Sequence, residues 1–261
     1  MRGRLLGGVV GLLLALTACG GAPADSSGPQ RSAPGRTSSP GADSTPQSVP
    51  PGCAGGQARD LDNALRIIKD GPECPGSTNQ FWQKQLGDKW TTPTIISYDD
   101  GTLPDSKCAD GGNPDDFSDN AFYCPLDDKV AYSNQLMERL FQKGGPYLPV
   151  VVLQHELGHR ADHIADIVGV VSRSEENQAD CDAGANTKFS LNAGRLPFTD
   201  ALKSAQLLFE LGDVSNFGAE TANDPGAHGS PPQRLTAYGR GYFQGLGICD
   251  NLGRNPTGHT L

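Results

Sequence analysis

The sequence predicts an α+β fold that is mainly helical, with a small sheet in its N-terminal half. Three observations support this prediction. Strand-forming patterns are confined to residues 94–98 and 121–132, whereas apolar residues recur at helical spacing along much of the remainder. The chain contains no internal repeats. About 200 residues follow the N-terminal region, which is enough for a single hydrophobic core.

The first elements expected along the chain are two helices. Residues 58–69 place leucine and isoleucine side chains at helical spacing. A second helix is expected over 78–86, where Phe81, Trp82 and Leu86 suit a core better than a binding surface.

A small amount of strand follows these helices. Residues 94–98 contain an isoleucine pair flanked by proline and by Asp-Gly, which is typical of a strand. Residues 121–132 indicate a short hairpin, with Pro125 and the pair Asp127-Asp128 at or near its turn. Further helices are expected over 133–142, 147–168, 174–192, 199–211 and 231–242.

The most informative motif is His-Glu-Leu-Gly-His at residues 155–159, which ends an apolar run. On a helix, His155 and His159 project from one face with the spacing of zinc ligands. Glu156 lies beside them, where it can act as general base on a metal-bound water. The alternative is a chance match on a surface helix, which average composition makes rare. We therefore expect one catalytic Zn²⁺ ion.

A catalytic zinc site needs a third protein ligand. Glu176 and Asp180 lie on the next expected helix at i, i+4 spacing, so both face the same side. Glu176 is then the candidate ligand, and Asp180 can accept a hydrogen bond from a ligand imidazole. The alternative is an acidic helix start, with Ser174 as N-cap and Glu175 in the first turn.

The motifs at 155–159 and 176–181 together resemble the bacterial family of putative neutral zinc metallopeptidases. Three further segments are similar to that family. They are Phe-Tyr-Cys-Pro at 122–125, His-Gly-Ser with Gln-Arg at 228–234, and Phe-Trp at 81–82 followed by the strand that begins near Pro93. The resemblance runs from about Asn79 to Gly245. It departs at Asn177, where the family has leucine, and at Ala131, which interrupts a Val-Tyr pair; both positions concern packing and strand register.

The resemblance implies a zincin-like metallopeptidase domain of the gluzincin type, with a small N-terminal sheet over the zinc-binding helices. It implies that His155, His159 and Glu176 bind the metal, and that Glu156 is the base and proton shuttle. Asp180 would orient His155. The hairpin would line the cleft, because an edge strand beside the zinc helix binds substrate backbone by strand addition.

Three residues nearer the C-terminus are less certain candidates. His228 can donate a hydrogen bond to the charge that develops on the carbonyl oxygen, or it is an ordinary loop histidine. Arg234 can pair with buried carboxylates of the site. Tyr238 is a weaker donor candidate that more readily fits the core.

The N-terminus has the zones of a secretory signal peptide over residues 1–18: Arg2 and Arg4, an apolar stretch, then small residues. Its Leu-Thr-Ala-Cys end resembles a lipoprotein box, so we expect lipidation of Cys19 and attachment to the bacterial cell membrane on the extracytoplasmic side. The alternative is an ordinary signal with an incidental cysteine. Residues 19–51 are rich in serine, proline and glycine and read as a disordered tether. The folded domain is expected over 52–261.

Six cysteines remain after Cys19, which in an exported chain suggests three disulfides. Local spacing favours two of them and leaves Cys181 for Cys249, unless Cys181 is a buried free thiol. The candidate pairs are Cys53–Cys74, Cys108–Cys124 and Cys181–Cys249.

The charge of the chain argues against a nucleic-acid partner. The net charge is −9, and the part after residue 50 carries 17 basic and 28 acidic residues. Nine of these acids fall between Asp99 and Asp128. A calcium site there is an alternative to a solvated acidic loop, but the spacing does not match an EF-hand.

These observations favour a membrane-anchored zinc endopeptidase acting on protein or peptide substrates. The second interpretation is a catalytically silent zinc-binding lipoprotein that serves as an interaction scaffold, which would have no use for Glu156. A third, a ligand-capturing lipoprotein of a transporter, would usually have two α/β lobes. Cleavage preference and any regulatory protein cannot be read from the chain.

Overall fold

The computed structural model describes residues 49–215, 221–224 and 227–258. Contacts between Cα atoms divide the chain into Met1–Thr45 and Pro46–Leu261, and all described residues belong to the second unit. The predicted signal peptide, Cys19 and nearly all of the predicted tether lie outside the described residues.

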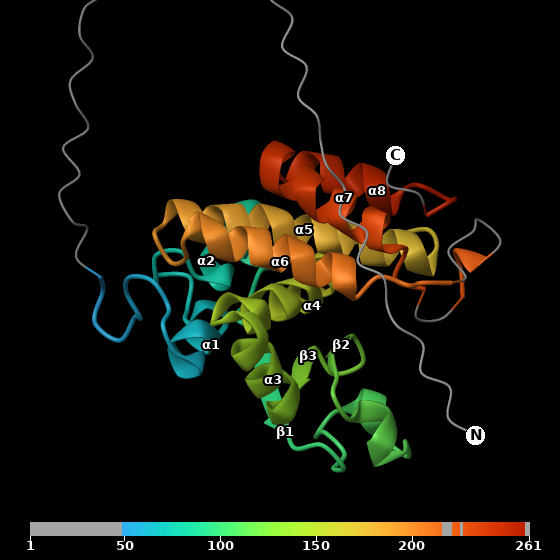
Figure 1. Cartoon of the computed structure of the whole chain (residues 1–261), viewed down its shortest axis with the longest axis horizontal. Coiled ribbons are helices and arrows are strands. Elements are labelled where there is room, and N and C mark those ends of the chain that lie inside the picture. Colours follow the sequence, from blue (N-terminus) through green and yellow to red (C-terminus); the bar gives the residue numbers. More distant parts are fainter. Residues whose placement is uncertain (1–48, 216–220, 225–226, 259–261) are drawn as a thin grey trace, which may run out of the picture. The chain divides into compact units, whose positions relative to one another are not determined.

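The described part of the chain is mainly helical with one small sheet, which confirms the α+β prediction (Figure 1). Its α-helices are α1 (Leu61–Lys69), α2 (Thr78–Leu86), α3 (Asn134–Gly144), α4 (Tyr147–Ala165), α5 (Ser172–Asn192), α6 (Phe198–Glu210), α7 (Pro231–Gln244) and α8 (Cys249–Gly253). Its strands are β1 (Thr94–Tyr98), β2 (Ala121–Cys124) and β3 (Lys129–Ser133). Short 3-10 turns cover Gly87–Lys89, Lys107–Ala109, Pro114–Phe117 and Leu246–Ile248.

The sheet has the strand order β1-β3-β2. The predicted hairpin is present, since β2 pairs antiparallel with β3 through a turn over residues 125–128. Asp128 in this turn has φ 52°, a left-handed conformation that aspartate adopts more readily than most residues. The parallel pairing of β1 with β3 joins segments distant in the sequence. This order leaves β2 with one free edge.

Helix α4 lies between the sheet and the layer formed by α5 and α6, and α7 packs on the far side of α5 (Figure 1). Glycines allow the close crossings. A Cβ atom on Gly184 would overlap the carbonyl oxygen of Tyr238, and one on Gly241 would overlap that of Cys181. On α4, a Cβ on Gly158 would lie 3.2 Å from Cα of Ala179. The two zinc-motif helices therefore approach each other backbone to backbone.

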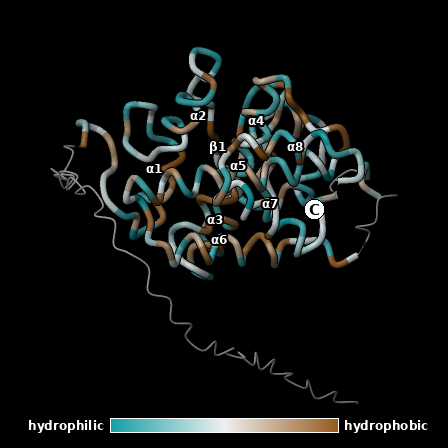
Figure 2. Tube along the Cα trace, turned by 90° about the horizontal axis from the view of Figure 1, so that it is seen from above, coloured by the Kyte–Doolittle hydropathy of each residue, from teal (hydrophilic) through white to brown (hydrophobic). Residues whose placement is uncertain are grey.

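The hydrophobic core surrounds α4 and extends to α1, α2 and α6. Phe81 and Trp82 are buried in it, as predicted, and Leu86 packs against it partly buried. Along the helices in Figure 2 the trace alternates between hydrophobic and hydrophilic colours, as expected of amphipathic helices. Among the described residues no helix has both the length and the apolar character needed to cross a membrane.

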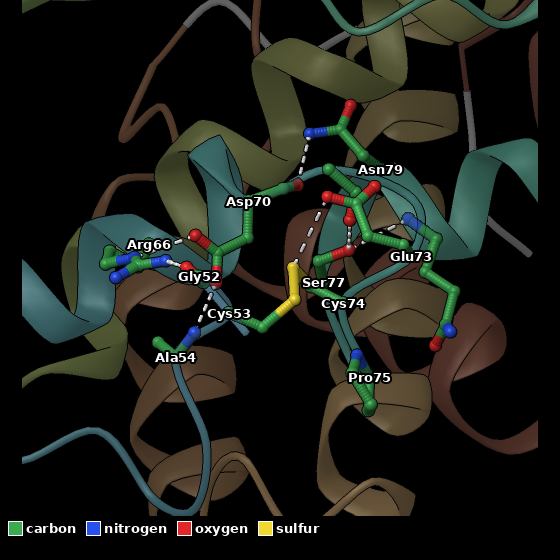
Figure 3. The surroundings of a disulfide bond; sticks show 12 residues. Gly52, Cys53, Ala54, Arg66, Asp70, Glu73, Cys74, Pro75, Ser77 and Asn79 are labelled. Carbon is green, nitrogen blue, oxygen red and sulfur yellow. Dashed lines mark hydrogen bonds and ion pairs between the residues drawn. A yellow bond between two sulfur atoms is a disulfide. The ribbon is translucent and has the colours of Figure 1, made fainter. Parts of the chain in front are cut away.

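All three candidate cysteine pairs form disulfides, with Cα–Cα distances of 5.3, 5.8 and 5.4 Å for Cys53–Cys74, Cys108–Cys124 and Cys181–Cys249. Cys181 is therefore not a free thiol. Figure 3 shows that the first disulfide lies beside Asp70, which accepts hydrogen bonds from Ala54 N at 2.8 Å and from Arg66 Nε at 2.7 Å. These contacts tie the start of the described chain to the end of α1.

Most helix boundaries differ from the predictions by a few residues, and two of these differences have an identifiable cause. Helix α5 begins at Ser172 after Val171, so Ser174 is not its N-cap. Ser174 lies one turn into the helix, where its Oγ accepts a hydrogen bond from Val171 N at 3.0 Å. Helix α4 ends at Ala165 because Asp166 is left-handed, with φ 60°.

Candidate metal centre

Three side chains from α4 and α5 converge on one point. His155 and His159 lie one turn apart on α4, and their Nε2 atoms are 3.1 Å apart. Glu176 reaches them from α5, with Oε2 3.2 Å from His155 Nε2 and Oε1 3.3 Å from His159 Nε2. All of the candidate ligand atoms lie within 4.8 Å of one another. The structure thus brings together the three residues predicted to be ligands.

The donor set fits a zinc ion. Two imidazole nitrogens and one carboxylate are common zinc ligands, and three of them leave a coordination position open. Glu176 Oε2 is buried and makes no hydrogen bond, although it lies close to His155 Nε2. A buried carboxylate oxygen without a partner is costly in a protein and is satisfied by a cation.

A second layer of charged groups supports this centre. Asp180 Oδ1 lies 2.8 Å from His155 Nδ1. Arg234 on α7 donates two hydrogen bonds of 2.8 Å to the same carboxylate, one from Nε and one from Nη2. Asp180 is completely buried. Its hydrogen bond to Nδ1 leaves Nε2 of His155 directed toward the other two ligands.

The electrostatics of the cluster without metal favour charged groups. Burial alone would lower the pKa of His155, but the hydrogen bond and charge of Asp180, followed by those of Glu176, raise it to about 10. Burial would raise the pKa of Glu176, but the charge of His159 and the close contacts of the Glu176 carboxylate with both imidazoles hold this pKa well below its usual range. Arg234 and then His155 likewise hold the pKa of Asp180 below normal despite its burial. The site therefore favours a proton on His155 until a cation replaces it.

Glu156 points to the cleft from the same helix turn. Its Oε2 accepts a hydrogen bond of 3.0 Å from the backbone N–H of Tyr123 on β2. Burial raises the pKa of Glu156. The positive charges of His155 and His159 oppose this rise, whereas the negative charge of Glu176 adds to it. A carboxylate with a raised pKa is a stronger base.

The C-terminal candidates occupy different places. His228 lies in the loop before α7, with Nε2 3.8 Å from Glu176 Oε2, and its side chain is half exposed. Tyr238 is buried and its hydroxyl donates to the carbonyl oxygen of Ala201 at 3.2 Å, so it belongs to the core. Only His228 of these two faces the centre.

Two cavities flank the centre. The larger, about 420 Å³, is lined by β2, by the zinc-motif face of α4 and by His228, and His163 and Glu175 also line it. The smaller, about 230 Å³, shares His155, Glu156 and His228 with the first and is also lined by Asp119 and Arg234. Its apolar lining residues are Ala121, Leu136, Leu140, Val152, Leu208 and Leu211.

The sequence reasoning missed Arg160, the residue directly after the motif. It is 1% exposed and forms two hydrogen bonds to Asp128 in the β2–β3 turn, at 2.7 and 2.8 Å. Its guanidinium also stacks on Trp90, with Cζ 4.4 Å from the ring centroid. A charged residue on a face of the helix that is otherwise buried was the available signal.

The acidic segment between Asp99 and Asp128 supplies no grouping of metal ligands among the described residues. One other grouping, Glu73 with Cys53 and Cys74, is not a metal site because the two cysteines form a disulfide.

The motifs and the geometry agree with a comparison of the sequence with known families. The family described as putative neutral zinc metallopeptidase matches residues 39–251, and the chain belongs to this family. Its match begins inside the predicted tether.

Uncharacterized proteins from Mycobacterium bovis and from two strains of Mycobacterium tuberculosis are similar to the chain. Each is 26% identical over 237 residues, which covers 78% of this chain and 77% of the relative. No solved structure matches the chain.

Proposed function

We propose that this protein is a zinc-dependent endopeptidase with a zincin-like catalytic domain. The observation that carries the proposal is the joint placement of Glu156 and the ligand cluster: the base lies beside His155, His159 and Glu176 and faces the same cleft. A site that only held zinc as a structural ion would need the ligands but not this carboxylate.

His155, His159 and Glu176 would hold the ion, and Asp180 would keep His155 in the tautomer that presents Nε2. Zinc, when bound, supplies a Lewis acid that polarises a peptide carbonyl and makes a water molecule more acidic. Glu156 takes the proton from the attacking water. The Tyr123 N–H fixes Oε2 of this carboxylate, and no other hydrogen bond to Glu156 exists among the described residues, so Oε1 is free to receive the proton. Glu156 then passes the proton to the leaving amine.

His228 is the candidate donor to the carbonyl oxygen. Its ring faces the cleft from the loop before α7, and Asp213 lies 3.9 Å from its Nδ1. Backbone contacts between Asp213 and Gly229 hold this loop, with Asp213 N donating to Gly229 O at 2.8 Å. A donor here would stabilise the negative charge that develops during attack.

The free edge of β2 would bind an extended peptide by strand addition, because its backbone borders the same cleft as Glu156. The smaller cavity would receive an apolar side chain next to the cleaved bond, since five leucine and valine side chains line part of its wall. The substrate class is therefore a protein or peptide in extended conformation.

We further propose that the enzyme acts outside the cytoplasm from a lipid anchor on Cys19. The charged, apolar and small-residue zones of residues 1–18 support export, and three disulfides suit an oxidising compartment. The serine-, proline- and glycine-rich segment after Cys19 would serve as a tether of the domain to the membrane.

The decisive experiment compares the wild type with Glu156→Gln for zinc content and for cleavage of an unfolded protein substrate. Both proteins should bind one zinc ion, and the variant should lose activity by a factor of about 10²–10⁴ because it lacks the base. Glu138→Gln, on an exposed part of α3, is the matched control and should retain activity.

Three other results would contradict the proposal in different ways. A wild type that binds no zinc would refute the ligand assignment. Zinc binding by both proteins without cleavage across a broad peptide library would favour the interaction scaffold. Equal cleavage by both proteins would remove Glu156 as the base.

A further inference from the structure

The two cavities extend in opposite directions from the metal centre along α4. The larger one is lined by His163, one turn beyond the zinc motif, and by Val168 in the connection to α5. The smaller one is lined by Val152, which precedes the motif on the same helix. Both include Glu156, so they meet at the proposed base. A substrate at the centre would therefore have one cavity on each side of the cleaved bond.

Strand β2 follows the same direction. Asp119, just before the strand, lines only the smaller cavity, Ala121 lines both, and Tyr123 and Pro125 line only the larger. A peptide added to the free edge of β2 would thus cross from one cavity to the other. Two helical turns beyond His155 are about 12 Å, which an extended peptide covers in about three or four residues. The two cavities would therefore bind different side chains of one substrate.

The larger cavity contains one carboxylate that the proposed chemistry does not use. Its three acidic lining residues are Glu156, Glu175 and Glu176. Glu176 faces the ligand histidines, and Glu156 accepts the Tyr123 N–H. Within the described ranges the Glu175 carboxylate forms neither a hydrogen bond nor an ion pair, and neither lysine nor arginine lines this cavity. Two charges of a zinc ion would offset Glu156 and Glu176, so the negative charge of Glu175 would remain uncompensated.

The α4–α5 connection holds Glu175 in place. A Cβ atom on Gly169 would lie 2.7 Å from Cγ of Glu175 and 2.5 Å from its backbone nitrogen, so the connection packs directly against the stem of this side chain. The backbone N–H of Glu175 donates to Val171 O at 3.1 Å. The side chain is half-buried. A carboxylate restricted in this way loses less conformational freedom when it pairs with a ligand.

Apolar surface lines the same end of the cleft. Val168 is 49% exposed, although it is a large apolar side chain. The ring of Tyr123 lies 6.1 Å from that of His163, measured between centroids. Together with a negative charge, such a surface suits a side chain that has an aliphatic stem and a cationic end. Lysine and arginine are the amino acids with this chemistry.

We propose that Glu175, Val168 and Tyr123 form a binding site for a lysine or arginine side chain of the substrate, on the opposite side of the cleaved bond from the apolar residue. The site rests on the proposed peptidase function and adds a substrate class to it. The enzyme would then cleave bonds that have an apolar residue on one side and a basic residue within about three positions on the other.

The test uses the zinc-loaded wild type and a set of peptides with blocked ends, so that terminal charges do not contribute. Each peptide carries one leucine, with lysine placed in turn at every other position. A matching set carries norleucine, which is lysine without its amine. Mass spectrometry identifies the cleaved bond. Lysine on the side opposite leucine should raise kcat/KM by about 5–20-fold over norleucine, and sodium chloride should reduce this ratio.

Glu175→Gln and Glu175→Lys are the informative variants. The amide should bring the lysine-to-norleucine ratio close to one, and the lysine variant should favour glutamate peptides over lysine peptides. Zinc content, measured for each variant, separates an effect on the substrate from an effect on the metal. Glu138→Gln, on an exposed part of α3, is the matched control and should keep the wild-type ratio.

A second readout does not depend on cleavage. Fluorescence anisotropy with zinc-loaded Glu156→Gln should show tighter binding of the lysine peptide than of the norleucine peptide, and adding Glu175→Gln should abolish the difference. Equal cleavage and equal binding of the two peptides by proteins with Glu175 would overturn the proposal, as would a lysine preference that survives in Glu175→Gln. Selective binding without cleavage of any peptide would support the site while contradicting the peptidase function.

Discussion

His155 links the two sides of the candidate centre. Its Nε2 faces His159 and Glu176, and its Nδ1 is 2.8 Å from Asp180 Oδ1. Arg234 forms two hydrogen bonds to the Asp180 carboxylate, so Asp180 and Arg234 together determine the orientation of the His155 ring. A ligand held in this way loses little freedom when a metal binds.

Replacing Asp180 by asparagine should weaken zinc binding by about 10–100-fold. The amide oxygen can still accept a hydrogen bond from His155, but the negative charge that increases imidazole basicity is lost and Arg234 loses its ion pair. Competition with a chromophoric zinc chelator measures the change. Asp200→Asn, on α6, is the control and should bind zinc as the wild type does; an unchanged affinity in Asp180→Asn would show that the orientation of His155 does not depend on this charge.

At the scale of elements, the most consequential contact joins α4 to the β2–β3 hairpin. Arg160 is nearly inaccessible, and it bonds both to Asp128 in the turn and to the Thr91 carbonyl at 2.9 Å. The same hairpin donates the Tyr123 N–H to Glu156. The proposed substrate-binding edge and the proposed base are therefore positioned by one pair of elements.

Asp128→Asn should lower the free energy of unfolding by about 1.5–3 kcal/mol, since hydrogen bonds to charged groups contribute on this scale. We also expect KM to rise more than kcat falls, because the edge strand becomes less well placed while the ligands stay on α4 and α5. Urea unfolding, steady-state kinetics and zinc content provide the three readouts. Loss of zinc together with activity would mean instead that the hairpin supports the metal ligands, and exposed Asp116→Asn provides the comparison.

At the scale of the whole molecule, stability should depend on metal and pH together. In the metal-free protein the pKa of His155 is about 10, above its ordinary value of 6.5. Protonated His155 therefore stabilises the fold fully below pH 6.5, and this contribution is lost as the pH rises toward 10. With zinc bound, the ion takes the place of the proton and this loss should disappear.

Urea unfolding between pH 6 and pH 9.5, with chelator and with zinc, measures this difference. The stability of the metal-free wild type should fall across the range, and His155→Gln should show a flatter dependence. His163→Ala, which alters an exposed histidine later on α4, should follow the wild type. A metal-free wild type whose stability is constant or rises with pH would contradict the assigned charge of the site.

The positions of most helices and strands could be predicted because they depend on short segments of the sequence. The bounds of α2 and β1 agree with the predictions, and those of the other predicted elements differ by a few residues. The differences arise where a backbone detail decides the boundary, as at Asp166, whose left-handed conformation ends α4 three residues early. The pairing of β1 with β3 was not predicted, since strand order depends on contacts between distant segments.

The sequence by itself determined which side chains can act together when they share a helix, because i, i+4 spacing places His155 beside His159 and Glu176 beside Asp180. It also determined the family, through motifs in fixed order. Only the tertiary structure decided which residues from different elements meet: Arg160 with Asp128, and Glu156 with the backbone of Tyr123. Those contacts depend on how α4 packs against the hairpin, and no local pattern in the chain records that.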